Sequence, residues 1–96
     1  MYFNTYNEKI IYVGKNDPYS LFSCMLAGVT YKNPNYRIVR NNCDVYVFEY
    51  VVSGKGSIEV GDRVYDVHEG MFYCLEKGVD EVHYASQDEP YEKMWI

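Results

Sequence analysis

Short runs of β-favouring residues, separated by turns that contain glycine, fill the second half of the chain. The most regular stretch is 51–84, and its turns contain Gly54, Gly56, Gly61, Gly70 and Gly78. Short runs bounded in this way are typical of half-buried strands. The pattern predicts antiparallel strands joined by tight turns, with hairpins at Gly54-Lys55-Gly56 and at Gly61-Asp62.

The same criteria predict strands along most of the chain. The run 21–27 is continuously apolar, so periodicity alone does not separate a strand from a short helix, and its flanking turn residues favour a strand. No long helix is indicated elsewhere. We therefore expect an all-β sandwich or barrel. The expected strands are 10–13, 21–27, 36–40, 45–52, 57–60, 63–67, 71–75, 82–85 and 91–96.

The run 45–52 is the longest of these, and its only charged residue is Glu49. So continuous a run predicts a strand that is covered on both faces. Successive side chains of a strand point to opposite faces. Glu49 and Val51 are therefore expected on one face, and Phe48 and Tyr50 on the other, together with Tyr46.

The length and composition indicate one folded domain. The chain has 96 residues, of which 48% are hydrophobic, and this argues against disorder. We expect a single domain over 1–96, with 1–9 as a flexible arm or an edge strand. The final predicted strand is still apolar at Trp95 and Ile96, which suggests that the sequence continues beyond this piece.

The charge balance excludes some classes of partner. The formal net charge is −5, and no basic stripe is present, so we expect no direct binding of nucleic acid by this chain. No apolar run approaches the roughly 18 residues of a membrane span, and no basic-then-apolar leader opens the sequence. We therefore expect a cytoplasmic protein without membrane contact.

Few residues suggest a metal or catalytic site. The three cysteines, Cys24, Cys43 and Cys74, have no metal-binding spacing and are expected to be buried free thiols. The two histidines are His68, expected to be exposed beside a turn, and His83. A metal centre formed by Glu49, His68 and His83 is possible but disfavoured, because a metal ion needs three or four convergent ligands and the strand 45–52 supplies Glu49 but no histidine. We assign no catalytic residue, metal or cofactor.

One set of short segments follows in a characteristic order and spacing. The segments are Ala27–Thr30, Asn35–Arg40, Glu49–Gly56, Gly70, His83-Tyr84, Glu89-Pro90-Tyr91 and Trp95. Together they resemble the N-terminal effector-binding domain of AraC-type transcriptional regulators. The likeness covers 27–96 and implies a small antiparallel double-stranded β-helix, the cupin or jelly-roll barrel. Two departures are Met71, where the family usually has an acid, and Glu76-Lys77-Gly78, where a proline is common.

The resemblance also implies a function and a set of contacts. Regulators of this kind continue into dimerising helices and a DNA-binding domain, so this chain would be the sensing part of a homodimer, and DNA binding would belong to the missing part. The positions at which related sensors contact their ligand correspond here to Thr30, Arg40, Tyr84, Lys93 and Trp95.

The residue types at these positions suit a sugar-like ligand. Arg40 offers a planar fork of donors, Thr30, His83 and Tyr84 offer smaller polar contacts, and Trp95 offers an aromatic surface. Each has a simpler explanation. Arg40 could form a surface ion pair, Trp95 could be a core residue, Tyr84 could cap the barrel, and His83 could make a structural hydrogen bond.

Three hypotheses follow. In the preferred hypothesis, the chain is an effector-sensing domain that binds a small-molecule effector and catalyses no reaction. The effector class that we expect is a carbohydrate. The alternative is a small metal-dependent cupin enzyme. The third is a barrel that acts only as a dimerisation module.

Overall fold

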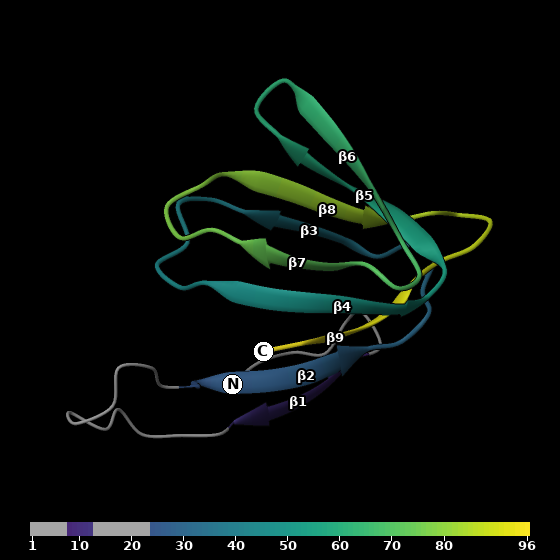
Figure 1. The fold of residues 1–96 in the computed structure, drawn as a ribbon, viewed down its shortest axis with the longest axis horizontal. Coiled ribbons are helices and arrows are strands. Elements are labelled where there is room, and N and C mark those ends of the chain that lie inside the picture. The colour runs from purple at the N-terminus through teal and green to yellow at the C-terminus, as the bar shows by residue number, and fades with distance from the viewer. Residues whose placement is uncertain (1–7, 13–23) are drawn as a thin grey trace.

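The computed structural model describes residues 8–12 and 24–96, which form nine β-strands in two antiparallel sheets (Figure 1). The first sheet has the order β1-β2-β9-β4-β7 and the second the order β3-β8-β5-β6. The predicted all-β antiparallel fold is confirmed. The strands are β1 (Glu8–Tyr12), β2 (Leu26–Thr30), β3 (Arg37–Arg40), β4 (Val47–Ser53), β5 (Lys55–Val60), β6 (Arg63–His68), β7 (Phe72–Leu75), β8 (Glu81–Ala85) and β9 (Glu92–Trp95).

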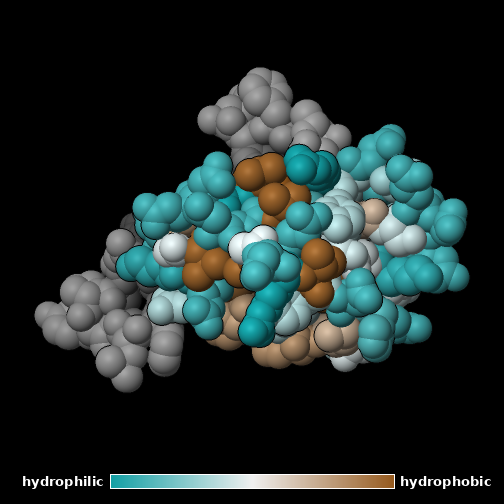
Figure 2. Space-filling model, turned by 90° about the horizontal axis from the view of Figure 1, so that it is seen from above, coloured by the Kyte–Doolittle hydropathy of each residue, from teal (hydrophilic) through white to brown (hydrophobic). Residues whose placement is uncertain are grey.

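Alternation along the strands separates an inner from an outer face. In β4, Glu49 and Val51 are buried, whereas Phe48 and Tyr50 are exposed, as the sequence pattern predicts. The described residues contain no helix long and apolar enough to span a bilayer. Figure 2 shows the molecule from above, turned by 90° from the view of Figure 1. The surface on this side is mostly hydrophilic, and its strongly hydrophobic residues form small separate groups.

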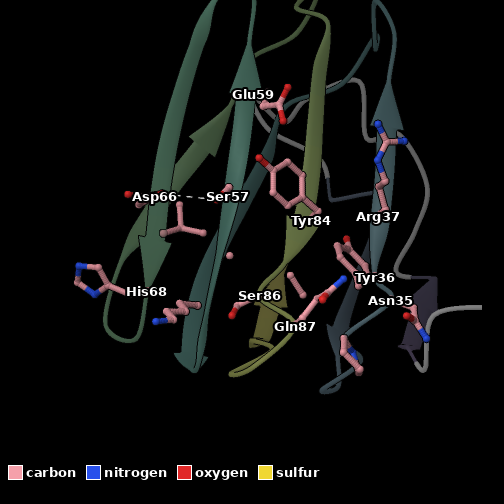
Figure 3. A pocket seen from close by; sticks show the side chains of 15 residues that line it. Asn35, Tyr36, Arg37, Ser57, Glu59, Asp66, His68, Tyr84, Ser86 and Gln87 are labelled. Atoms are coloured by element: carbon pink, nitrogen blue, oxygen red, sulfur yellow. Dashed lines mark hydrogen bonds between the residues drawn. The ribbon is translucent and has the colours of Figure 1, made fainter.

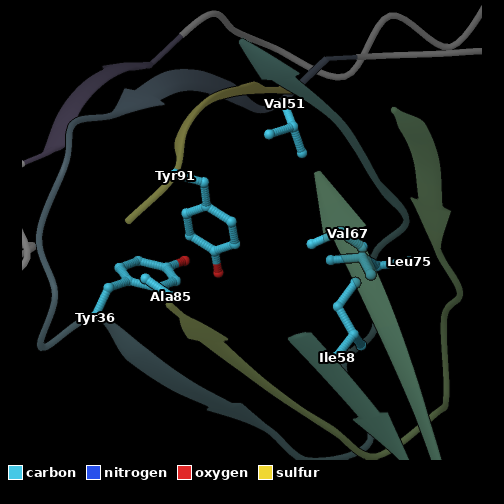
Figure 4. Packing of buried hydrophobic residues seen from close by; sticks show 7 residues of the cluster. All are labelled: Tyr36, Val51, Ile58, Val67, Leu75, Ala85 and Tyr91. Atoms are coloured by element: carbon cyan, nitrogen blue, oxygen red, sulfur yellow. The ribbon is translucent and has the colours of Figure 1, made fainter. Parts of the chain in front are cut away.

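Two groups among the buried core residues lie on opposite sides of the interior (Figure 4). Ile58, Val67 and Leu75 form an aliphatic group. Tyr36 and Tyr91 lie opposite them, with ring centroids 5.5 Å apart in an edge-to-face arrangement. Because tyrosine has a polar tip, the second group brings hydroxyls into the barrel as well as apolar surface.

The predicted hairpin at Gly54-Lys55-Gly56 is wrong. β4 pairs with β7 and β9, whereas β5 pairs with β6 and β8, so Gly54 lies where the chain passes from one sheet to the other. Gly54 has a φ of +75°, and a Cβ there would lie 2.4 Å from the Pro90 carbonyl oxygen. A glycine is therefore needed here because the chain turns sharply from one sheet into the other, and not because it forms a hairpin. The hairpin at Gly61-Asp62 is confirmed, since Val60 pairs with Arg63.

Two predictions about burial are also wrong. β4 is covered on one face only, because Phe48 is 44% exposed and Tyr50 is 40% exposed on the other. The cysteines are free, but Cys74 is exposed and the other two, Cys24 and Cys43, are half-buried. An apolar run does not by itself show how many layers cover a strand.

The first strands differ from their predicted bounds. β1 includes Glu8 and Lys9, so the end of the expected arm is an edge strand, while 1–7 and 13–23 lie outside the described residues. β2 begins at Leu26 rather than at 21, and it continues through Gly28. A Cβ on Gly28 would lie 2.4 Å from the Trp95 ring, so this glycine permits close packing inside a strand instead of ending one.

Candidate functional site

A buried ion pair lies in the barrel interior between β9 and β4. Lys93 is completely buried, and its Nζ donates to Oε1 of Glu49 at 2.8 Å. The Tyr73 hydroxyl donates to the same oxygen at 2.6 Å. The ammonium also lies 4.7 Å and 4.6 Å from the ring centroids of Tyr36 and Tyr91. Aromatic faces and a carboxylate thus replace the water that Lys93 loses on folding.

The surroundings of Glu49 keep its carboxylate ionised. Burial alone raises the pKa of Glu49, but the charge of Lys93, with hydrogen bonds from Lys93 and Tyr73, lowers it below its usual value. Burial, with the nearby charge of Glu49, raises the pKa of Tyr73 and of Tyr91. Both phenols therefore remain protonated and can donate hydrogen bonds.

A second polar group in the interior consists of Arg40, Glu81 and His83. Arg40 Nη1 donates to Glu81 Oε1, and its Nη2 donates to the Val45 carbonyl at 3.3 Å. His83 is 1% exposed, and its Nε2 lies 3.3 Å from Glu81 Oε1. This nitrogen makes no hydrogen bond of acceptable geometry to any residue that the structure describes. Burial lowers the pKa of His83, although the charge of Glu49 opposes this shift, so the imidazole is neutral at pH 7.

Thr30 and Trp95 form a third group, at the β1 side of the interior. Trp95 Nε1 donates to Thr30 Oγ1 at 3.1 Å, and that hydroxyl donates to Glu8 Oε1 at 2.7 Å. In the β2–β9 pairing, Thr30 lies opposite Lys93. The strands therefore bring these two residues to the same wall of the interior.

Five of the six predicted ligand contacts face this interior, and Tyr84 does not. Tyr84 lies on the outer face of the second sheet, beside a hollow of about 890 Å³ (Figure 3). Its interaction with Glu59 raises the pKa of its hydroxyl. Tyr84 directly follows His83 in β8, and neighbours in a strand point to opposite faces. The five interior positions are Thr30, Arg40, His83, Lys93 and Trp95.

A cleft of about 570 Å³ lies between the β5–β6 hairpin and β7. Its walls are mainly apolar and include Ile58 and Leu75, while Tyr73 and Glu81 also line it. These two polar residues connect the cleft to the interior. Tyr73 donates a hydrogen bond to Glu49, and Glu81 lies beside His83. An apolar pocket with a few convergent polar groups is the usual form of a small-molecule site.

The family model of the AraC-like ligand binding domain matches residues 23–96. The chain belongs to this family. The predicted resemblance to AraC-type sensors is thereby confirmed. No curated protein matches the sequence.

Solved structures support the same fold at low sequence identity. A protein of unknown function from Rhizobium leguminosarum has 17% identity and a TM-score of 0.67, over 93% of this chain and 78% of its own. The Cnp3 cupin domain of Schizosaccharomyces pombe has 13% identity and a TM-score of 0.65, over 93% and 62%. A cupin protein of Bacteroides fragilis has 14% identity and a TM-score of 0.63, over 73% and 61%. The chain spans about three fifths of the two cupin structures, and the predicted cupin double-stranded β-helix is confirmed.

Within this AraC-like domain, three interior residues lie outside the predicted set of ligand contacts. Glu49 could have been found, because it is the one charge in the run 45–52 and takes an inward position by alternation. Glu81 lies two residues before His83 and so shares its face. Tyr73 gave no such signal, since nothing in its local sequence shows that it reaches a carboxylate on β4.

The structure does not bring Glu49, His68 and His83 together. His68 is exposed, as predicted, and its Nδ1 lies 3.0 Å from the Glu69 carbonyl oxygen, whereas Glu49 and His83 are inside. Among residues 8–12 and 24–96, no group of three or more His, Cys, Asp or Glu side chains is arranged to hold a metal ion.

Proposed function

We propose that this AraC-like domain senses a small polar molecule that enters through the cleft and binds against the polar groups of the interior. The family membership supports a role in ligand binding. The cleft supports this location, because two of its lining residues, Tyr73 and Glu81, belong to the interior network.

The observation that carries the proposal is the buried Nε2 of His83, which lies 3.3 Å from Glu81 Oε1 but makes no hydrogen bond of acceptable geometry within the described part of the chain. A buried polar atom without a partner costs about 1–3 kcal/mol, so such atoms are rare unless something binds them. His83 itself does not line the cleft, but the adjacent Glu81 does, so a ligand that enters through the cleft would meet Glu81 first and reach this nitrogen beyond it. A hydroxyl of the ligand would supply the missing hydrogen bond.

A carbohydrate is the ligand class that we propose. Sugar hydroxyls both donate and accept hydrogen bonds, and the interior offers partners of both kinds. Arg40 only donates, Glu81 only accepts, and neutral His83 does one or the other according to its tautomer. Arg40 already contacts Glu81 and Val45, so a sugar would join an existing network.

We further propose that the domain works in the cytoplasm as part of a dimeric transcription regulator. Ligand binding without a chemical step would shift the population of two arrangements of the domain, and DNA binding would belong to another part of the protein. The resemblance of residues 27–96 to AraC-type sensors supports this context. The alternative, a metal-dependent cupin enzyme, would be favoured by stoichiometric metal in the purified protein that is lost in His83→Ala.

A ligand screen with paired histidine variants tests the proposal. Thermal shift and calorimetry would compare wild type, His83→Leu and His68→Leu against a panel of mono- and disaccharides. We expect at least one sugar to raise the Tm of wild type and of His68→Leu, with a much smaller effect on His83→Leu. The proposal fails if no sugar stabilises wild type, or if both variants respond equally.

A further inference from the structure

A row of four outward side chains crosses the second sheet at the hollow beside Tyr84. Arg37 on β3 pairs with Tyr84 on β8 in the strand register. Ser57 on β5 pairs with Tyr84 on one side and with Asp66 on β6 on the other. All four residues line the hollow of about 890 Å³, so the hollow extends across every strand of this sheet.

The two ends of the row carry opposite charges. Arg37 lies on one side of the Tyr84 ring and Asp66 on the other (Figure 3). Glu59 lies two residues after Ser57 and therefore on the same face of β5, where it adds a second carboxylate on the Asp66 side. One cation and two carboxylates thus face the same hollow from opposite sides.

These three charges have no ion-pair partner within residues 8–12 and 24–96. Lys55 also lines the hollow, but its ammonium lies 3.6 Å from a carboxylate oxygen of Glu89. Asp66 accepts a long hydrogen bond, 3.5 Å, from the Ser57 hydroxyl, which leaves its charge uncompensated. A ligand with a charge at each end could neutralise both sides of the hollow at once.

The spacing of the strands sets the length of such a ligand. Neighbouring strands are about 4.8 Å apart, so β3 lies about 10 Å from β5 and about 14 Å from β6. With a charge-assisted hydrogen bond of about 2.8 Å at each end, the charges of the ligand should be about 4–8 Å apart. An extended peptide spans about 3.5 Å per residue, so a dipeptide of about 7 Å has the required length.

The middle of the hollow suits the backbone of a peptide. The half-buried Tyr84 offers a ring face and a hydroxyl, and Ser57 beside it offers a second hydroxyl on a small side chain. The side-chain amides of Asn35 and Gln87 also line the hollow. An amide both donates and accepts hydrogen bonds, as a peptide group does, so these residues can bind the uncharged part of the ligand.

We propose that the hollow beside Tyr84 is a second binding site, which takes a dipeptide in its zwitterionic form. The planar fork of donors on Arg37 binds the carboxylate of the peptide, and Asp66 with Glu59 binds its ammonium group. The Tyr84 ring contacts the backbone between them. Because alternate residues of β8 face the hollow and the interior, the two sites are separate, and this proposal does not rest on the proposed function.

Calorimetry of the 96-residue chain with alanyl-alanine tests the proposal. We expect saturable binding to wild type and binding about tenfold weaker to Arg37→Gln and to Asp66→Asn, because each variant loses a charge-assisted contact. Acetylating the ammonium or amidating the carboxylate of the peptide should weaken binding to wild type by a similar factor. The matched control is Arg63→Gln, which removes the same charge at an exposed position outside the hollow and should bind as wild type does.

The interior provides a second control. Trp95 is the only tryptophan and bonds Thr30 in the interior, so the dipeptide should leave its fluorescence unchanged. His83→Leu should bind the dipeptide as wild type does, and circular dichroism would show that each variant is folded.

Three results would overturn the proposal of a dipeptide site. The first is the absence of saturable binding up to millimolar concentrations. The second is equal binding of capped and free peptides, or equal weakening in Arg63→Gln and Arg37→Gln. The third is binding that His83→Leu abolishes and Arg37→Gln retains, since the peptide would then occupy the interior.

Discussion

The barrel interior and the hollow beside Tyr84 contain the same kinds of side chain in opposite surroundings. Inside, Glu49 and Lys93 form a buried ion pair, and Tyr73 donates to the same carboxylate. Outside, Asp66 and Tyr84 line an open hollow. β8 separates the two regions, because alternate residues of this strand face each side.

Because the residue types match, we expect the contribution of a polar contact to differ between the two regions through its surroundings alone. Charges in a dry interior interact strongly, and removing one partner leaves the other uncompensated. Exposed charges are screened by water and salt. Paired substitutions, one inside and one outside, can therefore test whether the interior network stabilises the fold.

The largest difference is expected for the carboxylates. Glu49→Gln should lower the free energy of unfolding by about 3–5 kcal/mol, because it leaves the buried Lys93 without its counter-ion. Asp66→Asn, on the outer face, should change it by no more than about 0.5 kcal/mol. Denaturant unfolding measures both values, and equal losses would contradict the distinction between the two regions.

The tyrosines should show a smaller difference. Tyr73→Phe removes a hydrogen bond to a charged, buried carboxylate, which should lower the free energy of unfolding by about 1.5–3 kcal/mol. Tyr84→Phe removes a hydroxyl that water can replace, so its effect should be clearly smaller. The same denaturant titrations provide the comparison, and a larger loss in Tyr84→Phe would show that the hollow is the more important region.

The free energy of unfolding is expected to depend on pH through His83. Because the pKa of His83 is lowered in the folded state, its contribution is complete above about pH 6.5 and is lost as the pH falls through the folded pKa. One such proton gives a slope of at most about 1.4 kcal/mol per pH unit. His83→Gln should flatten this slope, and His68→Gln should retain it.

A second loss of stability is expected at lower pH. The pKa of Glu49 is also lowered, so its contribution is complete above about pH 4.3 and decreases below that value. His83→Gln should retain this second loss. Unfolding curves between pH 7 and pH 3 would separate the two steps, and a His83→Gln curve identical to that of wild type would remove His83 from the explanation.

The smallest effect is expected for the ion pair of Lys55 with Glu89. Its atoms are 3.6 Å apart, and both side chains are more than half exposed. Lys55→Ala should change the free energy of unfolding by about 0.5 kcal/mol or less, and added salt should reduce the difference further. The loss in Glu49→Gln should persist in the same salt series, since the buried pair is shielded from ions.

Much of the fold follows from local pattern. Alternation places Lys93 and Trp95 on one face, and it also explains why Glu49 is inside. The same rule places His83 and Tyr84 on opposite faces of β8. The prediction that both contact one ligand was therefore at odds with strand geometry. The role of Tyr84 as a ligand contact stays a prediction. Its side chain lies on the outer face, whereas the other five predicted contacts face the interior.

The sequence by itself determined where strands and turns lie and which side chains share a face, because both depend on neighbouring residues. The tertiary structure decided which strands pair, so that Gly54 lies at a corner between sheets. It also decided the partners of the buried charges: Lys93 and Glu49 are 44 residues apart, and Arg40 and Glu81 are 41 apart. Such contacts depend on how distant segments pack together, and no local pattern specifies them.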